Sequence, residues 1–251
     1  QGPAIELFER EFAKFSNSKF AVAVCNGTAA LHSAMFAAGV SKGDEVITSP
    51  NSFVATSNSI LYQEGIPVFA DIDKRTFNID PSEIVKKISK KTKVILPVHF
   101  SGQPCDMHKI KQIADEHNCI VISDSCHAIG AKFDNKEISN FSDYTTHSFH
   151  PVKHMTSGEG GIILTNSEEN YEKLKLFRTH GITKDPMLMN NVEGPWYYEM
   201  LNLGYNYRIT DFQSALALSQ LRKINSFIDK RKQIASDYND LMANIPEITL
   251  P

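Results

Sequence analysis

The sequence has no long hydrophobic segment, no strong excess of charge of one sign and no signal peptide. No apolar run in its 251 residues approaches the roughly 20 that cross a bilayer. Its 26 basic and 29 acidic residues give a net charge of -3, which offers no electrostatic attraction for nucleic acid or an anionic membrane. Gln1-Gly2-Pro3 leads directly into the amphipathic stretch 5–15, without the charged and apolar regions of a signal peptide. These absences predict a globular cytoplasmic protein that binds neither nucleic acid nor membrane.

The chain also lacks the cysteine and histidine spacings of a metal site. Its four cysteines form no C-x-x-C pair, and two lie in or beside apolar strand-like runs, which favours buried reduced thiols. Three histidines lie close together, at His147, His150 and His154. If 144–150 is extended, the first two point to opposite faces, and Pro151 prevents a helix that would align the last two. This spacing argues against a metal, zinc included.

Short apolar runs alternate with longer amphipathic ones along the chain. The expected strands are 20–25, 45–48, 68–72, 93–98, 119–123, 144–148 and 161–165, and the expected helices between them are 28–38, 53–62, 81–88 and 107–117. This order predicts strand–helix–strand units and an α/β fold, with a mostly parallel sheet covered by helices on both faces.

A long helix is expected from Thr210 to about Met242. Thr210 and Gln213 have the spacing of a capping box, and apolar residues follow in an approximate helical stripe. Such a helix would be about 50 Å long, which suggests that it links two lobes. We therefore expect a large domain over residues 1–209, and over 210–251 the linking helix and the start of a smaller domain. Because both ends look unfinished, the chain is expected to be a fragment.

Lys153 has an unusual setting for a lysine. A lone lysine is most often a solvated surface charge, but Lys153 lies between an apolar strand and the glycine-rich turn 156–161. A lysine held in a tight, partly dry turn can lose its proton and act as a nucleophile toward a carbonyl. This setting predicts a covalent catalyst that uses an aldehyde cofactor.

Asp124 directly follows the apolar run 119–123, so it is expected at the carboxyl end of a parallel strand, where α/β sheets place ligand sites. An aspartate there can equally be a helix N-cap. As a functional residue it would face a pyridine nitrogen, keep it protonated and make the ring an electron sink. His127, three residues later, could lie flat against such a ring, although a histidine alone is more often structural.

The stretch Asn26-Gly27-Thr28-Ala29 follows a strand and opens a helix. Backbone amides at a helix start, with a threonine hydroxyl, can form a phosphate cradle, although many strand–helix turns carry Gly and Thr. Ser148, five residues before Lys153, could reach the same phosphate. The chain has neither a P-loop nor the G-x-G-x-x-G motif, which disfavours ATP and nicotinamide cofactors.

Taken together, these residues resemble the sugar aminotransferases of the DegT/DnrJ/StrS family, which have the type I fold of pyridoxal-phosphate-dependent transferases. The matching stretches cover nearly the whole chain in the family's order and are NGTAALHSAM (26–35), SPNSFVATSNSI (49–60), PVFADID (67–73), SDSCHAIGA (123–131), SFHPVKHMTSGEGG (148–161), RTHGITKDP (178–186) and GYNYRITDFQSALALSQL (204–221). The resemblance implies an aspartate-aminotransferase-like large domain, a small C-terminal domain that is largely absent, and pyridoxal 5'-phosphate as the cofactor.

The resemblance also implies a role for each matching residue. Lys153 would be the catalytic residue and bind the cofactor covalently. Asp124 would pair with the pyridine nitrogen, and His127 would stack on the ring. The residues implied to hold the phosphate are Gly27, Thr28, Ala29 and Ser148. Asn206 would reach the phosphate bound by the neighbouring subunit, which implies a homodimer.

Two departures from the family pattern concern the site. The family usually has an acidic residue before the aspartate, where this chain has Ser123. Family members also have a further N-terminal segment and a small C-terminal domain that contribute to the sugar site. Both are missing here, so the substrate contacts are expected to lie largely outside the chain.

Within the family, HPVKH, RTHGITKDP and PWYYEMLNLGYNYR most resemble the C4 transaminases that make UDP-4-amino-4,6-dideoxy-N-acetyl-β-L-altrosamine for pseudaminic acid. The implied reaction transfers an amino group from glutamate to the C4 ketone of a UDP-linked 4-keto-6-deoxy-N-acetyl hexose, for a surface glycan. The alternatives are a transaminase for a GDP-sugar or a C3 ketone, a cofactor-binding dehydratase relative or regulatory module without turnover, and a plain nucleotide-binding module. The segment 181–200 is expected to cover the site or to form a subunit interface.

Overall fold

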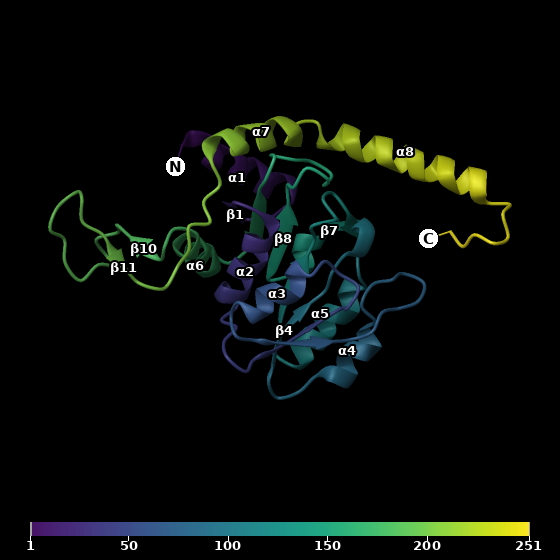
Figure 1. Ribbon diagram of the computed structural model, residues 1–251, viewed down its shortest axis with the longest axis horizontal. Helices are drawn as coiled ribbons and strands as arrows, with labels where there is room; N and C mark the ends of the chain where they lie inside the picture. Colours follow the sequence, from purple (N-terminus) through teal and green to yellow (C-terminus); the bar gives the residue numbers. More distant parts are fainter. Residues whose placement is uncertain (1, 251) are drawn as a thin grey trace.

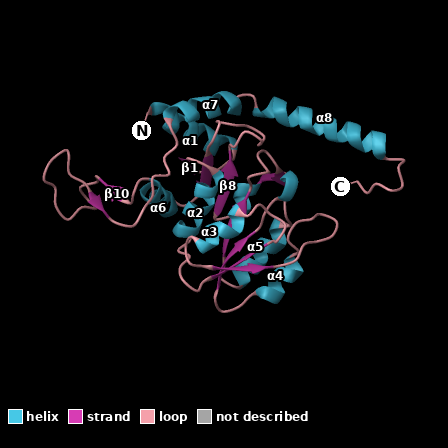
Figure 2. Cartoon of the chain, viewed as in Figure 1, coloured by secondary structure: helices cyan, strands magenta, loops and turns pink. Residues whose placement is uncertain are grey.

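A computed structural model describes residues 2–250, with a seven-stranded sheet at its centre (Figure 1, Figure 2). The strand order is β1-β9-β8-β5-β4-β2-β3, with β1 at Phe20–Val24, β2 at Glu45–Thr48, β3 at Ile66–Phe69, β4 at Thr92–Leu96, β5 at Ile120–Asp124, β8 at Tyr144–Ser148 and β9 at Gly161–Thr165. β9 is antiparallel to β1 and β8, and the other neighbouring pairs are parallel. The prediction of an α/β fold with a mostly parallel sheet is confirmed. The outer bounds of the two predicted domains, Gln1 and Pro251, lie outside the described residues.

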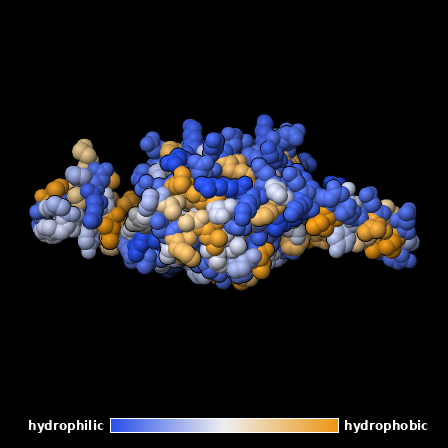
Figure 3. Space-filling model, turned by 90° about the horizontal axis from the view of Figure 1, so that it is seen from above, coloured by the Kyte–Doolittle hydropathy of each residue, from blue (hydrophilic) through white to orange (hydrophobic). Residues whose placement is uncertain are grey.

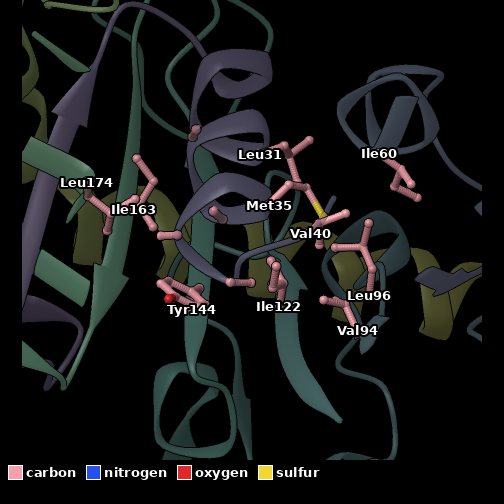
Figure 4. Packing of buried hydrophobic residues seen from close by; sticks show 14 of the residues in the cluster. Leu31, Met35, Val40, Ile60, Val94, Leu96, Ile122, Tyr144, Ile163 and Leu174 are labelled. Carbon is pink, nitrogen blue, oxygen red and sulfur yellow. The ribbon is translucent and has the colours of Figure 1, made fainter. Parts of the chain in front are cut away.

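Helices cover both faces of the sheet, as expected for strands that are apolar on both sides. Successive strand residues point to opposite faces. On β1, Val22 and Val24 belong to one core cluster, while Ala21 and Ala23 belong to another. The first face is covered by α2 (Gly27–Ala37), α3 (Ala55–Leu61) and α6 (Glu168–Arg178), and the second by α1 (Pro3–Phe15), α4 (Pro81–Lys87), α5 (Met107–Glu116) and α7 (Asp211–Leu221). Figure 4 shows the first face, where side chains of α2 pack over the middle strands.

Most predicted elements are found within one or two residues of their expected bounds, and β3 differs most. The strand was expected at 68–72 and is found at Ile66–Phe69, so it includes Pro67. Proline is tolerated there because β3 is an edge strand that pairs with β2 alone.

Several short elements and one helix were not predicted from the sequence. The short elements are the hairpin β6 (Lys132–Phe133) and β7 (Lys136–Glu137), the hairpin β10 (Ile182–Thr183) and β11 (Glu199–Met200), and the 3-10 turns Phe100–Gly102 and Ile138–Phe141. The missed helix is α6, although its signals are present in the sequence. The Ser167 side chain accepts a hydrogen bond from the amide of Asn170, acidic residues occupy the first turn, and Lys175 and Arg178 lie in the last turn.

The prediction of one long helix from Thr210 to Met242 is wrong. The capping box at Thr210 and Gln213 is present, but the helix ends at Leu221, and α8 (Ile224–Met242) begins after a turn. At this turn the amide of Lys223 bonds to the carbonyl of Gln220, three residues back, so the helical ladder is interrupted. Leu221 and Ile224, on either side of the turn, are both buried in the core against α1 and β9.

Two parts project from the body on opposite sides (Figure 1, Figure 3). One is the arm formed by residues 182–203 around β10 and β11, and the other is the distal part of α8. Hydrophobic residues are visible on both projections in the space-filling view, and the exposed ones include Met187, Trp196 and Leu203 in the arm and Ile234 and Leu241 on α8. The arm contributes no residue to the principal cavity of the described chain.

Candidate active site

The principal cavity has a volume of about 450 Å³ and lies at the carboxyl ends of the parallel strands. Its walls come from five separate segments: the turn from β1 into α2, the start of α3, Val98 after β4, the end of β5 with the residues that follow it, and the loop from β8 to β9. The structure brings six of the predicted site residues to this cavity, namely Gly27, Thr28, Asp124, His127, Ser148 and Lys153.

Lys153 lies in a loop that is closed at its base by the antiparallel pairing of β8 and β9. The amide of Phe149 bonds to the carbonyl of Gly160 at 2.8 Å, and the amide of Ser157 bonds to the carbonyl of Phe149 at 3.0 Å. The amide of Lys153 itself bonds to the carbonyl of His150 at 2.9 Å, which forms a tight turn. Gly158 has a φ of 81°, in the left-handed region that favours glycine. The turn holds Lys153 half-buried at the cavity wall.

Asp124 is the last residue of β5 and is almost fully buried, with 6% of its surface exposed. Its carboxylate accepts two hydrogen bonds. The hydroxyl of Thr56 donates to Oδ2 at 2.8 Å, and the amide of Cys126 donates to Oδ1 at 3.2 Å. The backbone of Asp124 is held by Pro97 and His99 at the end of β4. The carboxylate is therefore fixed in orientation at the cavity wall, and it is not the N-cap of a helix in the described chain.

Cys126 and His127 lie directly after Ser125, and the pKa of each is shifted in the direction that favours its uncharged form. Burial, and then the charge of Lys153, lowers the pKa of the His127 imidazole, while Asp124 acts in the opposite direction. Burial, with the charge of Asp124, raises the pKa of the Cys126 thiol well above its usual range. The thiol is therefore protonated at neutral pH and is a poor nucleophile.

The first residues of α2 form an open, electropositive end beside the cavity. The side chain of Asn26 caps the helix by accepting a hydrogen bond from the amide of Ala29 at 2.8 Å. Among residues 2–250 the amides of Gly27 and Thr28 have no hydrogen-bond acceptor. A Cβ atom on Gly27 would lie 2.8 Å from the Cβ of Ser148, so glycine allows α2 to approach the end of β8 this closely. Two amides and two hydroxyls thus converge where a helix dipole favours an anion.

Two of the predicted site residues do not line the cavity. The amide of Ala29 is already bonded to the Asn26 cap, so this residue has no free donor to offer. Asn206 lies beside the end of α6, where it forms a β-bridge with Thr179, and its side chain is exposed. Its neighbours Tyr205 and Tyr207 stack on each other with ring centroids 5.0 Å apart.

The three clustered histidines have separate environments. His147 is buried with Nδ1 3.0 Å from the carbonyl oxygen of Ser125, and burial lowers its pKa to about 4. His150 lies at the cavity rim, with Nε2 3.9 Å from a carboxylate oxygen of Glu159. Burial lowers the pKa of His154. In the part of the chain that the structure describes, no group of His, Cys, Asp and Glu side chains has the arrangement of a metal site.

Thr56, Phe53 and Glu159 also line the cavity and were not predicted from the sequence. Glu159 lies in the glycine-rich turn 156–161 that follows Lys153, so the sequence contains a local signal for its position. Thr56 gave none, because the partner of its hydroxyl is 68 residues away in the sequence. Over residues 2–250, no helix combines the length and apolar character needed to cross a membrane.

Comparison with known proteins gives matches over the whole chain. A model of the DegT/DnrJ/EryC1/StrS aminotransferase family matches residues 1–251. Among curated proteins, the chain is 42% identical over 250 residues to the uncharacterized protein MJ1066 of Methanocaldococcus jannaschii, with 100% of this chain and 65% of the relative covered. It is 40% identical to the spore coat polysaccharide biosynthesis protein SpsC of Bacillus subtilis (100% and 64% covered). It is 36% identical to GDP-perosamine synthase of Escherichia coli O157:H7 (99% and 65% covered). The chain thus spans less than two thirds of the length of these relatives.

Solved structures give the same fold. An aminotransferase from Psychrobacter cryohalolentis superimposes with a TM-score of 0.91 at 36% identity, with 96% of this chain and 62% of that chain covered. The Helicobacter pylori aminotransferase PseC, involved in the biosynthesis of pseudaminic acid, superimposes with a TM-score of 0.90 at 34% identity (98% and 64% covered). The PLP form of the sugar aminotransferase Spr1654 from Streptococcus pneumoniae superimposes with a TM-score of 0.90 at 28% identity (97% and 65% covered).

Proposed function

The chain belongs to the DegT/DnrJ/EryC1/StrS aminotransferase family, and from this membership we propose that it is the cofactor-binding part of a nucleotide-sugar aminotransferase. The cofactor is pyridoxal 5'-phosphate. The amino donor is glutamate, and the acceptor is a ketone on a sugar linked to a nucleotide.

The observation that carries this proposal is the convergence of four kinds of group on one cavity. Lys153 supplies an amine, Asp124 a fixed carboxylate, and His127 a ring whose pKa is lowered by burial. Gly27 and Thr28 line the same cavity, and within residues 2–250 their amides have no hydrogen-bond acceptor. These are the groups that a phosphorylated pyridine aldehyde requires, so the residues fit this cofactor.

Each residue has a defined task in the proposed reaction. When bound, pyridoxal phosphate supplies a protonated aromatic ring that withdraws electrons from the carbon bearing the amino group. Asp124 keeps the ring nitrogen protonated, and His127 holds the ring plane. Gly27, Thr28 and Ser148 bind the phosphate. The amine of Lys153 would hold the cofactor through Nζ, and in its free form it would be the group that takes up and returns the proton of the carbon next to nitrogen.

For the acceptor we propose the C4 ketone of a UDP-linked 4-keto-6-deoxy-N-acetyl hexose, on a route to pseudaminic acid or a related surface glycan. The likeness to PseC supports this choice. The likeness to GDP-perosamine synthase gives equal support to a GDP-linked sugar. The walls of the cavity offer both apolar surface, from Phe53 and Val152, and polar groups, from His150 and Glu159, for the bound sugar.

We also propose that the active enzyme is a homodimer. Asn206 is exposed and does not line the cavity of its own chain, and the projecting arm carries exposed apolar residues such as Trp196 and Met200. A second copy would cover this apolar surface. In the dimer Asn206 reaches the phosphate bound by the neighbouring subunit.

The cofactor proposal is tested by the visible absorption of the purified protein with pyridoxal phosphate, before and after reduction by borohydride. We expect a visible band that reduction removes, together with a mass increase on the peptide that contains Lys153. A protein that stays colourless, or a Lys153→Ala variant that still acquires the reduced adduct, would refute the proposed role of Lys153.

The acceptor is tested by product analysis with a panel of UDP- and GDP-linked 4-keto sugars and glutamate. Formation of an amino sugar from the UDP-linked N-acetyl substrate supports the proposal for the acceptor. Turnover of the GDP-linked sugars alone would replace it with the perosamine-type reaction. A cofactor-loaded protein that does not convert to the amino form with glutamate would favour a cofactor-binding relative without transaminase turnover.

A further inference from the structure

Thr56 is a buried polar residue beside the site for which the proposed function gives no task. It lies in the first turn of α3 with 1% of its surface exposed. Its hydroxyl donates to Oδ2 of Asp124 at 2.8 Å, so this bond joins α3 to the end of β5. Oδ1 of the same carboxylate receives the amide of Cys126 from the other side. Thr56 therefore supplies a side-chain hydrogen bond to Asp124 from a helix that is distant in the sequence.

The hydroxyl of Thr56 does not make the hydrogen bond that is usual for a Ser or Thr hydroxyl inside a helix. Ser and Thr side chains inside helices commonly bond to a carbonyl of the preceding turn. Ser59, on the same helix and equally buried, does this by donating to the carbonyl of Thr56 at 2.8 Å. A hydroxyl has a single proton to donate, and in Thr56 that proton is directed to a carboxylate in another element. The β-branched side chain of threonine also has few rotamers, which keeps the hydroxyl in place.

We propose that Thr56 is a positioning residue for the cofactor, because its hydroxyl fixes the carboxylate of Asp124 in the orientation that the pyridine nitrogen requires. This inference rests on the proposed function, in which Asp124 is the partner of that nitrogen. Thr56 acts through Asp124 and does not itself take part in proton transfer. Without the hydroxyl, Oδ2 loses a charge-assisted hydrogen bond, and the amide of Cys126 on Oδ1 holds the orientation of the carboxylate less firmly.

The test compares Thr56→Val with Ser59→Ala, its matched control. Valine has nearly the shape of threonine but no hydroxyl, and Ser59→Ala removes an equally buried hydroxyl that serves only its own helix. Pyridoxal phosphate is titrated into each apo protein and followed by visible absorption. Thr56→Val is expected to bind pyridoxal phosphate roughly 10-fold more weakly and to show a changed absorption band, because a hydrogen bond to a charged group is lost. Ser59→Ala is expected to bind with wild-type affinity and spectrum.

Two further variants separate positioning from a structural effect. Thr56→Ser restores the hydroxyl and is expected to recover most of the affinity and the wild-type absorption band. Thr56→Ala makes the same comparison with a smaller side chain if the valine variant does not fold, as judged by thermal melting of the apo protein. Wild-type affinity and spectrum in a folded Thr56→Val or Thr56→Ala protein would overturn the inference, as would a folded Thr56→Ser that binds no better than they do. If wild-type protein itself fails to bind the cofactor, the proposed function fails instead.

Discussion

Substitution of Gly27 by alanine tests the proposed phosphate cradle most directly. Gly27 is the first residue of α2, and its φ is outside the left-handed region. Alanine can therefore adopt the same backbone conformation, and any effect comes from the space that its Cβ needs. That atom would lie 2.8 Å from the Cβ of Ser148 and 3.4 Å from the sulfur of Cys126. Because the Cβ of Ser148 is fixed to β8, the start of α2 or the end of β8 must move.

The expected cost follows from two opposing effects. Alanine in place of glycine in a helix favours folding by up to about 1 kcal/mol. Overpacking a close contact costs typically about 1–3 kcal/mol. We expect a net loss of about 1–2 kcal/mol in the free energy of unfolding of the apo protein, or a decrease of a few degrees in melting temperature. The effect on the cofactor is expected to be larger, because the displacement moves the amides of Gly27 and Thr28 away from the phosphate.

The assay is a titration with pyridoxal phosphate, followed by visible absorption, alongside thermal melting of the apo protein. Gly27→Ala is expected to weaken binding at least roughly 10-fold, the loss of about one hydrogen bond to a charged group. The control is Ser33→Ala, on the same helix, which removes a buried hydroxyl bonded to the carbonyl of Ala29 at 2.7 Å. It is expected to lower the melting temperature without changing the affinity. Wild-type affinity in Gly27→Ala would refute the assignment of the cradle to the start of α2.

Three further predictions concern the nucleophile, a buried ion pair and the buried histidines. Lys153→Ala is expected to abolish borohydride-dependent attachment of the cofactor, measured by intact mass, while leaving the circular dichroism spectrum unchanged. Glu9→Ala leaves the buried guanidinium of Arg178 without its partner and should lower the free energy of unfolding by about 3–5 kcal/mol, measured with urea; a change within experimental error would contradict this. Burial lowers the pKa of His99 to about 3 and that of His147 to about 4, so the unfolded chain binds more protons below pH 6.5. The free energy of unfolding should therefore fall as the pH decreases from 6.5 toward 4, by about 1.4 kcal/mol per pH unit for each histidine. A melting temperature that does not change over this pH range would contradict the prediction.

Most strands could be predicted because they are short apolar runs bounded by polar residues or glycine, although β8 (YTTHS) is largely polar. The bounds of β2, β8 and β9 agree with those read from the sequence. The break between α7 and α8 could not be predicted, because nothing in Leu221–Asn225 disfavours a helix locally. The break depends on how Leu221 and Ile224 pack against the core, which is a property of the folded chain.

The site was predictable in part, for a similar reason. Asp124 and the turn of Lys153 are identifiable because each has a local signal, a strand end and a glycine-rich turn. That they face one cavity is a result of the fold, and their roles toward the cofactor stay predictions. Thr56 could not be identified, since a threonine in a helix has no local signal that it bonds to a carboxylate in a distant strand.

The single reversed strand explains why residues from distant segments meet at one cavity. β5 and β8 are parallel, so the loop that follows β8 lies at the same edge of the sheet as Asp124. Because β9 is antiparallel to β8, this loop is a hairpin connection that stays at that edge, and it holds Lys153 there. β9 is also antiparallel to β1, and Val24 pairs with Gly161, so the start of α2 reaches the same edge. A crossover helix after β8 would have taken the chain to the opposite edge before the next parallel strand. The antiparallel pairing of β9 on both sides therefore brings the amine of Lys153, the carboxylate of Asp124 and the start of α2 together.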